Sequence, residues 1–342
     1  MAGTISIQTT ATPESSRIRR RSSGWAGPTG LVILVLVGVG CFATLPWTIG
    51  QIDVAGGVER RYEAGDLSLN LLPPSILGYG EGDSSRVDEV IEKGGFVPNL
   101  ALGTDKLGRS VLARVLLGGA VSLGIGLASA IIAVSIGTLL GGIAGFVGGR
   151  VDAAIMRVVD VLYGLPYILL VVLISVAADG VIGRLGLDPS SSARQLVNVA
   201  TLLVAIGGVG WLTTARVIRG QVLSLRSQPF MEACRAQGMG PARQFLRHLL
   251  PNLVGPIIVY GTLAVPAAIL SESFLSFLGI GVEEPLPSWG NLASEGLSEL
   301  NTVRSRWWLL AWPCAFIAIT LVSLNLLGDR LKARFDPVHG SP

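Results

Sequence analysis

The chain has 342 residues, of which 50% are hydrophobic and only 14% are charged, and its net charge is +3. A soluble domain carries about 25% charged residues, so this composition argues against a soluble protein. Charged residues are absent from six long windows, each near or above the roughly 20 residues that cross a bilayer as a helix: 31–50, 115–149, 161–178, 195–215, 253–271 and 307–328. We therefore predict an all-α polytopic membrane protein with six transmembrane helices; the alternative is six buried helices of a large soluble core.

The N-terminal segment 1–27 is rich in Ser, Thr and Arg and has no apolar period, so we expect a disordered basic tail. We place the first transmembrane helix at 28–50. Its apolar stretch is longer than the roughly 7–15 residues of a signal-peptide core, so we expect it to stay as an anchor. The loop 51–111 follows with six basic and ten acidic residues, and its first part, 51–100, matches no motif that indicates a function.

The distribution of Lys and Arg predicts which segments face the cytoplasm, because cytoplasmic loops carry an excess of these residues. The first tail has four arginines shortly before the apolar stretch, the loop 216–250 has six arginines and one acid, and the C-terminal tail 329–342 has three basic residues. Placing these segments inside puts both termini in the cytoplasm and 51–111 outside. Five further transmembrane helices then form a core at 112–328.

Glycine is unusually frequent in the second apolar window. Gly137, Gly141 and Gly145 recur every four residues, which places them on one helix face and lets another helix backbone approach closely. The spacing predicts a tight helix–helix contact, either within this chain or with a partner.

A polar insert, residues 231–252, interrupts the apolar sequence, within a segment below the membrane that we place at about 219–252. Helix-favouring residues begin at Glu232, Gly238 interrupts them, and a proline soon afterwards suits the first turn of a second helix. We expect two short helices separated by a glycine hinge, with Pro251 ending the second one.

The second of these helices, 241–250, is amphipathic. Its apolar residues lie four apart and its arginines lie on another face: Phe245 with Leu249, Leu246 with Leu250, and Arg243 with Arg247. Such a shape fits a groove on another protein, and the alternative is a helix that lies on the lipid surface.

The insert carries Glu232-Ala233, then Gly238, then nine residues, then His248-Leu249-Leu250-Pro251. This order resembles the EAA loop of bacterial ABC-importer permeases, most closely that of the C-type subunit of the dipeptide and oligopeptide branch. Three further segments, in the order of that branch, carry the resemblance over about 80–337: LGTDKLGRSVL at 102–112, ESFLSFLG with PSWG at 272–290, and NLLGD with FDP at 325–337. The chain departs from the family pattern at three positions, Ser110, Cys234 and Pro241.

The resemblance implies a bacterial inner-membrane permease subunit of an ATP-driven importer for short peptides. In that family the EAA loop is a cytoplasmic plug that docks on an ATP-binding subunit. The resemblance assigns the coupling role in this chain to the following residues: Glu232, Ala233, Arg235, Gly238, Arg243, His248, Leu250 and Pro251. Asp105, Gly108 and Arg109 belong to the family motif at the entrance to the second span, which we interpret as a structural collar rather than a peptide site.

The resemblance also implies partners: a homologous permease in a heterodimer, one or two ATP-binding subunits, an extracytoplasmic substrate-binding protein and the lipid bilayer, but no nucleic acid. ATP and Mg²⁺ are then expected on the ATP-binding subunits, with no cofactor in this chain. Two alternatives stay open. The same machinery carries another ligand, such as nickel or haem, or the chain is an ion-coupled secondary transporter.

No enzyme site is expected in the chain. The sequence lacks a G-x-x-x-x-G-K-[ST] loop and has only three lysines, so it is not the ATPase. Its two histidines have no ligand partners for a metal, and no G-x-S-x-G or Ser/His/Asp constellation occurs.

Two acids lie close to spans. Asp160 is interpreted as a cytosolic cap and Glu272 as an external-face residue, with a substrate contact in the translocation path as the alternative for either. Trp289, Trp307 and Trp308 are expected to anchor the chain at the external membrane interface. The alternative for these tryptophans is a surface that receives the substrate-binding protein.

Overall fold

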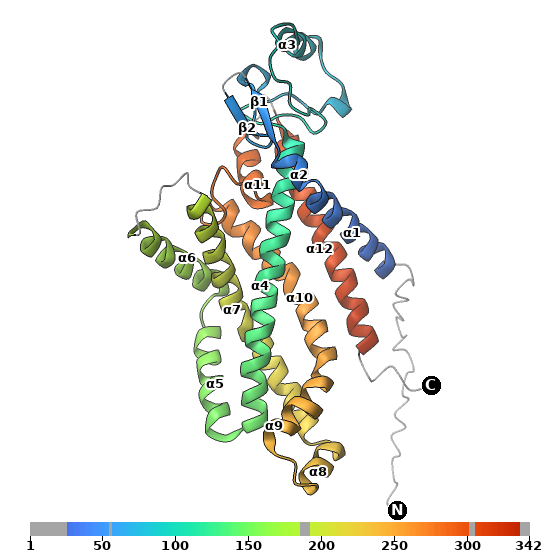
Figure 1. Ribbon diagram of the computed structural model, residues 1–342, viewed down its shortest axis with the longest axis vertical. Helices are drawn as coiled ribbons and strands as arrows, with labels where there is room; N and C mark the ends of the chain where they lie inside the picture. Colours follow the sequence, from blue (N-terminus) through green and yellow to red (C-terminus); the bar gives the residue numbers. More distant parts are fainter. Residues whose placement is uncertain (1–25, 55–56, 185–191, 301–304, 336–342) are drawn as a thin grey trace, which may run out of the picture.

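The computed structural model describes residues 26–54, 57–184, 192–300 and 305–335. Almost all of the tail predicted at 1–27 lies outside these residues, as does the end of the predicted C-terminal tail. The described chain is an elongated helical bundle with a small cap at one end (Figure 1). Five helical segments are long and apolar enough to cross a membrane: Pro28–Thr48, Val111–Val147, Ala193–Arg226, Pro241–Phe277 and Trp307–Arg334.

The predicted third transmembrane helix is bent. Helix α5 (Gly149–Tyr163) and helix α6 (Tyr167–Arg184) meet at 91°, so the described spans number five, or six if the bent pair is one span. The break falls on Gly164-Leu165-Pro166. Pro166 has no backbone N–H to donate, and its ring disfavours a helical conformation at the residue before it. The charge-free window 161–178 therefore marks parts of two helices rather than one straight span.

Helix α4 (Val111–Val147) is the central element, and it packs along helix α7 (Ser192–Arg226) and helix α10 (Leu250–Phe277). The predicted glycine stripe faces α7 within this chain. A Cβ added to Gly137 would lie 2.5 Å from the Cβ of Thr214, and a Cβ on Gly145 would lie 2.8 Å from the Cβ of Val222. Close backbone approach therefore joins the two longest helices.

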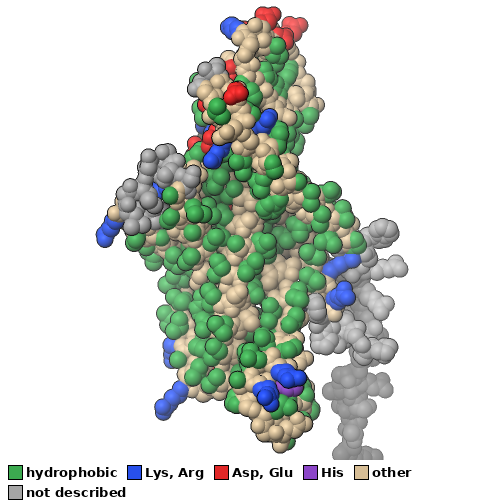
Figure 2. All heavy atoms as spheres, in the orientation of Figure 1, with side chains coloured by type: hydrophobic (Ala, Val, Ile, Leu, Met, Phe, Trp, Pro, Cys, Tyr) green, Lys and Arg blue, Asp and Glu red, His purple; other side chains and the backbone are tan. Residues whose placement is uncertain are grey.

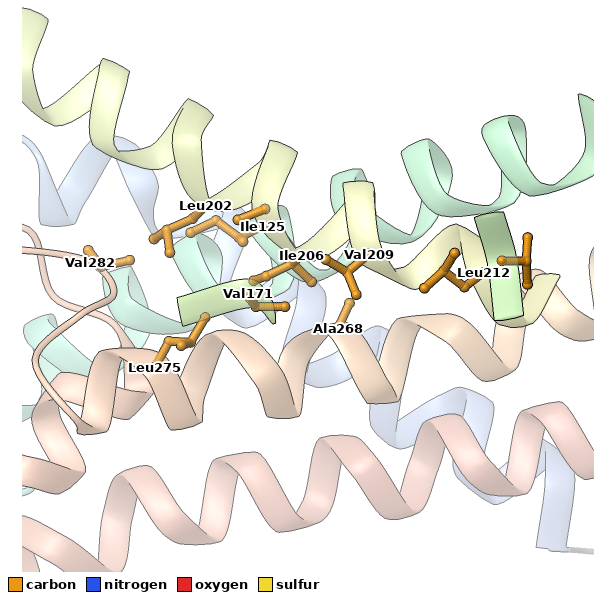
Figure 3. Close-up of a cluster of buried hydrophobic side chains, with 11 residues drawn as sticks. Ile125, Val171, Leu202, Ile206, Val209, Leu212, Ala268, Leu275 and Val282 are labelled. Atoms are coloured by element: carbon orange, nitrogen blue, oxygen red, sulfur yellow. The ribbon is translucent and has the colours of Figure 1, made fainter. Parts of the chain in front are cut away.

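The largest buried apolar cluster lies where α6, α7 and α10 meet α4. Figure 3 shows Ile206, Val209 and Leu212 along α7, with Ala268 of α10 beside them. Helix α1 (Ala26–Ala43) packs on helix α12 (Trp307–Phe335), which also contacts α10. Helix α12 runs past residue 328, so the predicted boundary between core and tail lies inside a helix.

The segment 51–100 forms the cap. It contains the antiparallel hairpin of β1 (Gln51–Val54) and β2 (Gly57–Arg60), two short 3₁₀ turns, η1 (Leu67–Leu69) and η2 (Ser75–Leu77), and helix α3 (Glu81–Glu92). Leu69, Leu72 and Val90 form a small core of its own. Between the cap and the bundle lie helix α2 (Leu45–Thr48) and helix α11 (Trp289–Ser298).

The opposite end of the bundle, here called the insert end, carries helix α8 (Pro229–Ala236), helix α9 (Pro241–Arg243) and the π-helix η3 (Gln244–Leu249). Figure 2 shows hydrophobic side chains over the middle of one face of the molecule. Asp and Glu gather at the cap end of that face, whereas the charged side chains at its insert end are those of Lys and Arg. An apolar belt between two charged ends is the surface expected of a membrane protein.

Candidate functional site

The polar insert begins with α8, which lies across the ends of two spanning helices. One face of α8 is buried, because Met231 has an exposed fraction of 0% and Cys234 is also buried. Met231 joins a cluster from α7, η3 and α10: Ile218, Val222, Leu249 and Leu253. The cysteine that departs from the EAA pattern is thus a small packing residue, and α8 is fixed to both helices by hydrophobic burial.

The other face of α8 is open. Glu232, Ala233 and Ala236 are exposed, and the side chain of Phe230 is exposed by 36%. This face presents one acid, one aromatic ring and small residues that let another surface come close. Phe230 was not among the predicted site residues, and its position four residues before buried Cys234 puts it at the border of the buried face, so helical periodicity does not predict its exposure.

Gly238 ends α8 in a turn that requires glycine. Its φ is +68°, a left-handed conformation that costs other residues roughly 1–2 kcal/mol. The N–H of Gly238 donates to the carbonyl of Arg235 at 3.0 Å, and that of Met239 donates to the carbonyl of Cys234 at 3.1 Å. These two bonds are the Schellman motif of a helix C-terminus, so the predicted glycine break lies here and has a defined conformation.

Arg235, one of the predicted coupling residues, links α8 to the end of α7. Its guanidinium Nη2 donates to the carbonyl of Arg226 at the end of α7, at 2.9 Å. Arg243 is exposed and His248 is half-buried. Only part of the predicted set therefore faces away from the chain.

The apolar stripe predicted for docking on another protein packs inside this chain instead, so that part of the prediction is wrong. Leu249 is fully buried, and the ring of Phe245 meets that of Phe146 edge to face, with centroids 5.3 Å apart. Leu246 is the exposed member, at 61%. The physical reason is that apolar side chains of α7 and α10, such as Ile218 and Leu253, cover this face within the chain.

Pro251 does not end the helix, contrary to the prediction. The helical segment continues from Pro241 to Phe277, and Pro251 is the second residue of α10. Proline is tolerated here because it follows the π turn, where the register of backbone bonds changes and one donor is not needed. The N–H of Leu250 donates to the carbonyl of Phe245, and the Asn252 amide donates to the carbonyl of His248 at 2.6 Å.

The predicted collar at the start of α4 is a network of buried charges. Asp105 accepts Nε of Arg109 at 2.6 Å and Nη1 of Arg114 at 2.7 Å, and it also accepts backbone N–H groups of Leu107 and Arg109. Arg114 then donates to both carboxylate oxygens of Glu295 in α11, at 2.7 and 2.9 Å. The carboxylates and guanidinium groups form ion pairs with one another, which agrees with a structural role.

Gly108 completes the collar by letting the cap approach. Its φ is +72°, and a Cβ there would overlap the backbone of Asp66 in the cap.

The sequence did not predict the pairing of Arg114 with Glu295, which are 181 residues apart. The signal for Arg114 in the sequence was the group of charged residues over 105–114, which immediately precedes a long charge-free span.

The pKa of Glu295 lies below its ordinary value. Burial raises it, but the hydrogen bonds and charge of Arg114 lower it further. Glu284 has its pKa raised, mainly by a hydrogen bond with Glu295 and then by burial. The hydrogen bond between the two carboxyl groups thus shifts their pKa values in opposite directions.

Glu272 and Trp289 lie in the interior of this subunit, and the placement of either at an external surface is corrected. Glu272 is 0% exposed, and its carboxylate accepts hydrogen bonds from the hydroxyl groups of Ser273 at 3.3 Å and Ser276 at 2.8 Å. Trp289 is also 0% exposed, and its indole Nε1 donates to the carbonyl of Val115 at 3.0 Å. A membrane-interface tryptophan would keep one edge in contact with lipid or water; in this chain Trp307, exposed by 46%, fits that role.

The chain is similar to known proteins over a range that contains long apolar helices and the polar insert. A sequence model of the binding-protein-dependent transport system inner membrane component matches residues 137–338. The dipeptide transport system permease protein DppC of Bacillus subtilis is 42% identical over 235 residues, which are 69% of this chain and 68% of the relative. The oligopeptide transport system permease protein OppC of Haemophilus influenzae is 40% identical over 69% of both chains.

The chain belongs to this family. It is an inner-membrane permease subunit of a binding-protein-dependent ABC importer, and as such it acts with a binding protein and with ATP-binding subunits. The matched range contains the insert, Glu272, Trp289 and Glu295, whereas Asp105, Gly108 and Arg109 precede it. Among solved structures, a chain of the inward-facing methionine transporter MetNI aligns with 63% of this permease at 16% identity and a TM-score of 0.44, too distant a likeness for comparing sites.

Proposed function

We propose that this permease carries short peptides across the inner membrane in an ATP-driven importer. The observation that carries this proposal is its identity of 39–42% to permeases named for dipeptide and oligopeptide transport. The alternative cargo is another ligand, such as nickel or haem, because the shared motifs concern the machinery and not the cargo.

The exposed face of α8 is the surface that we assign to the ATP-binding subunit. It offers Glu232 and Ala233, which are exposed, and the partly exposed ring of Phe230 at the insert end. The buried face of α8 holds α7 and α10 through Met231. A movement of the ATP-binding subunit would then pass through α8 to both spanning helices, as in rigid-body switching.

The remaining parts of the proposal concern assembly and sidedness. A homologous permease completes the membrane unit, and ATP with Mg²⁺ is bound by the ATP-binding subunits. The insert end and both termini face the cytoplasm, and the cap faces the binding protein. Arginines at the insert end and acids on the cap support this orientation.

Reconstitution tests the function directly. The assembled importer in proteoliposomes, given its binding protein and a radiolabelled dipeptide, should accumulate the dipeptide only when the ATP-binding subunits receive ATP. Accumulation driven by a proton gradient alone would support the secondary-transporter alternative. Accumulation of nickel or haem without dipeptide would change the cargo and leave the ATP-driven machinery in place.

A second experiment tests the docking face. Ala233→Trp should leave the permease in the membrane but reduce the amount of ATP-binding subunit that co-purifies with it. The matched control is Ala333→Trp, which is exposed on α12 outside the insert and should co-purify as the unmodified chain does. Equal loss in both variants would contradict the assignment to α8.

A further inference from the structure

A cavity of about 440 Å³ lies in the middle of the bundle, between α4, α7, α10 and the bend that joins α5 to α6. Its volume falls within the range of small-molecule sites. Ser129, which lines it, is the central residue of α4. One wall is the apolar cluster of Figure 3, through Ile206, Val209 and Ala268. The cavity therefore lies near the middle of α4, away from both charged ends of the bundle.

The bend of the third span shapes the cavity. Helix α5 stops at Tyr163 and helix α6 starts at Tyr167, and the 91° turn between them directs α6 away from the bundle. Both tyrosines line the cavity, and Tyr260 of α10 lines it as well. The lining is therefore mostly apolar and aromatic, with a few polar groups, as in sites that bind apolar side chains.

One polar group in the lining has no hydrogen-bond partner within the described residues. The hydroxyl of Ser129 is buried, and no acceptor or donor of the described chain reaches it. Buried hydroxyl groups are almost always hydrogen-bonded in native proteins. Other buried hydroxyl groups of the described residues, such as those of Thr138 and Ser175, share this state, and the Ser129 oxygen is shielded from the cavity space, so the argument for a ligand rests on the charges beside the cavity.

A pair of opposite charges stands beside the cavity on its insert-end side. The guanidinium of Arg216 lies over the ring of Tyr163, with its carbon 4.3 Å from the ring centroid, and it donates to Asp160 at 2.9 Å. Both side chains are exposed, by 44% and 65%. Exposed ion pairs contribute little stability, so the two charges are available for exchange with a charged ligand.

The neighbouring arginine on α7 is different. Arg219 contacts both carboxylate oxygens of Asp152, at 2.5 and 2.7 Å, and is less exposed. This bidentate pair ties α5 to α7, whereas Arg216 meets only one oxygen of Asp160. Of the two arginines, Arg216 has the more exposed and single-contact ion pair, so a ligand carboxylate can replace Asp160 more easily there.

We propose that this cavity binds an apolar or aromatic side chain of a short peptide during transport, while Arg216 and Asp160 recognise the peptide's carboxylate and ammonium groups. This assignment rests on the proposed peptide cargo. The combination of an apolar cavity and one charge of each sign beside it matches a zwitterion with a hydrophobic side chain.

Photo-crosslinking in the assembled importer tests the proposal. The probe is the dipeptide alanyl-p-azidophenylalanine, added to the importer in nanodiscs without binding protein, and the adducts are mapped by mass spectrometry. Adducts are expected within 162–170 or 260–268, which border the cavity. Excess alanyl-phenylalanine should suppress them, whereas N-acetyl-phenylalanine amide, which lacks both charges, should not.

Variants divide the site into its parts. Ala264→Phe fills the cavity and should abolish labelling, while the matched control Ala318→Phe, exposed on α12, should label as the unmodified chain does. Arg216→Gln and Asp160→Asn should each weaken labelling by roughly tenfold, because each removes one charge-assisted contact. Membrane level and gel-filtration profile show that each variant is folded.

Three outcomes would overturn the proposal. Adducts outside the cavity would remove the site, and equal suppression by the uncharged competitor would indicate an apolar occupant such as a lipid acyl chain. A gain in labelling when phosphatidylglycerol nanodiscs are replaced by phosphatidylethanolamine nanodiscs would assign the charged pair to the anionic lipid headgroup, which then competes with the dipeptide. Dipeptide uptake by the same preparation is measured in parallel, so that failure of this site is distinguished from failure of the peptide function.

Discussion

Gly141 of α4 lies directly against the backbone of Ala215 of α7, so closely that a Cβ on Gly141 would overlap the carbonyl of Ala215. The same helix carries Gly124, where an added Cβ would meet no atom within 4 Å. The two glycines therefore have different physical roles on one helix.

Substitution by alanine distinguishes these roles. Gly141→Ala should destabilise the permease by about 1–3 kcal/mol, because it overpacks a backbone contact that cannot move locally. Gly124→Ala should leave stability within about 0.5 kcal/mol of the unmodified chain. The measurement is the apparent Tm of the purified protein by fluorescence-detected gel filtration, and equal Tm values would contradict the packing argument.

Gly238 gives a prediction about coupling rather than stability. Gly238→Val forces a branched residue into the left-handed conformation, at about 1–2 kcal/mol, and should turn the exposed face of α8 without unfolding the membrane core. We expect normal membrane levels and reduced ATP-dependent dipeptide uptake. Gly240→Val is the control, because Gly240 has φ −65° and open space around it. Equal uptake by the two variants would show that the turn at Gly238 does not matter for transport.

Sequence patterns predicted the parts of this fold that depend on local rules. Charge-free windows located five of the spans, whereas the window 161–178 falls across the bend between α5 and α6, and the four-residue glycine spacing predicted the contact that Gly141 makes. The inward packing of Phe245 and Leu249 could not be predicted, since amphipathic periodicity shows that a helix face is apolar but not which surface covers it. The burial of Trp289 and the pairing of Arg114 with Glu295 depend on contacts between distant segments, which no local pattern encodes.

The collar network predicts a large effect from one buried arginine. Arg114 is exposed by only 1% and bridges Asp105 and Glu295. Arg114→Ala should destabilise the permease by about 3–5 kcal/mol, because two carboxylates lose their partner. Arg114→Lys should recover part of this loss, since a single ammonium cannot form the bidentate contact with Glu295. Yield and apparent Tm after extraction measure both effects, and an unchanged Tm in the alanine variant would contradict a structural collar.

The same network predicts how stability depends on pH. The folded pKa of Glu295 lies below the ordinary value of 4.5, so its contribution is fully present above that value and is lost as the pH falls through the folded pKa. Glu299 has a lowered pKa as well, because Arg306 and Lys106 outweigh its burial, and it contributes with the same sign. Glu284, whose pKa is raised, contributes with the opposite sign.

Glu295→Gln should therefore lower the apparent Tm at neutral pH and reduce the further fall in Tm on acidification below pH 4.5. The control is Glu92→Gln in the cap, where the side chain is exposed, and it should retain the acid dependence of the unmodified chain. An acid-induced fall of the same size in both variants would show that the stability loss arises elsewhere.

Trp289 and Trp307 test whether burial or membrane anchoring governs the tryptophans at the cap end. Trp289 packs in the core beside Phe316 and bonds to Val115, so Trp289→Ala should cost about 3–5 kcal/mol and lower the yield of folded permease. Trp307 is exposed by 46%, and Trp307→Ala should leave yield and Tm close to those of the unmodified chain. Parallel expression, detergent extraction and thermal scans provide the comparison. A greater loss in the Trp307 variant would mean that contact with lipid, rather than packing in the core, stabilises this end of the bundle.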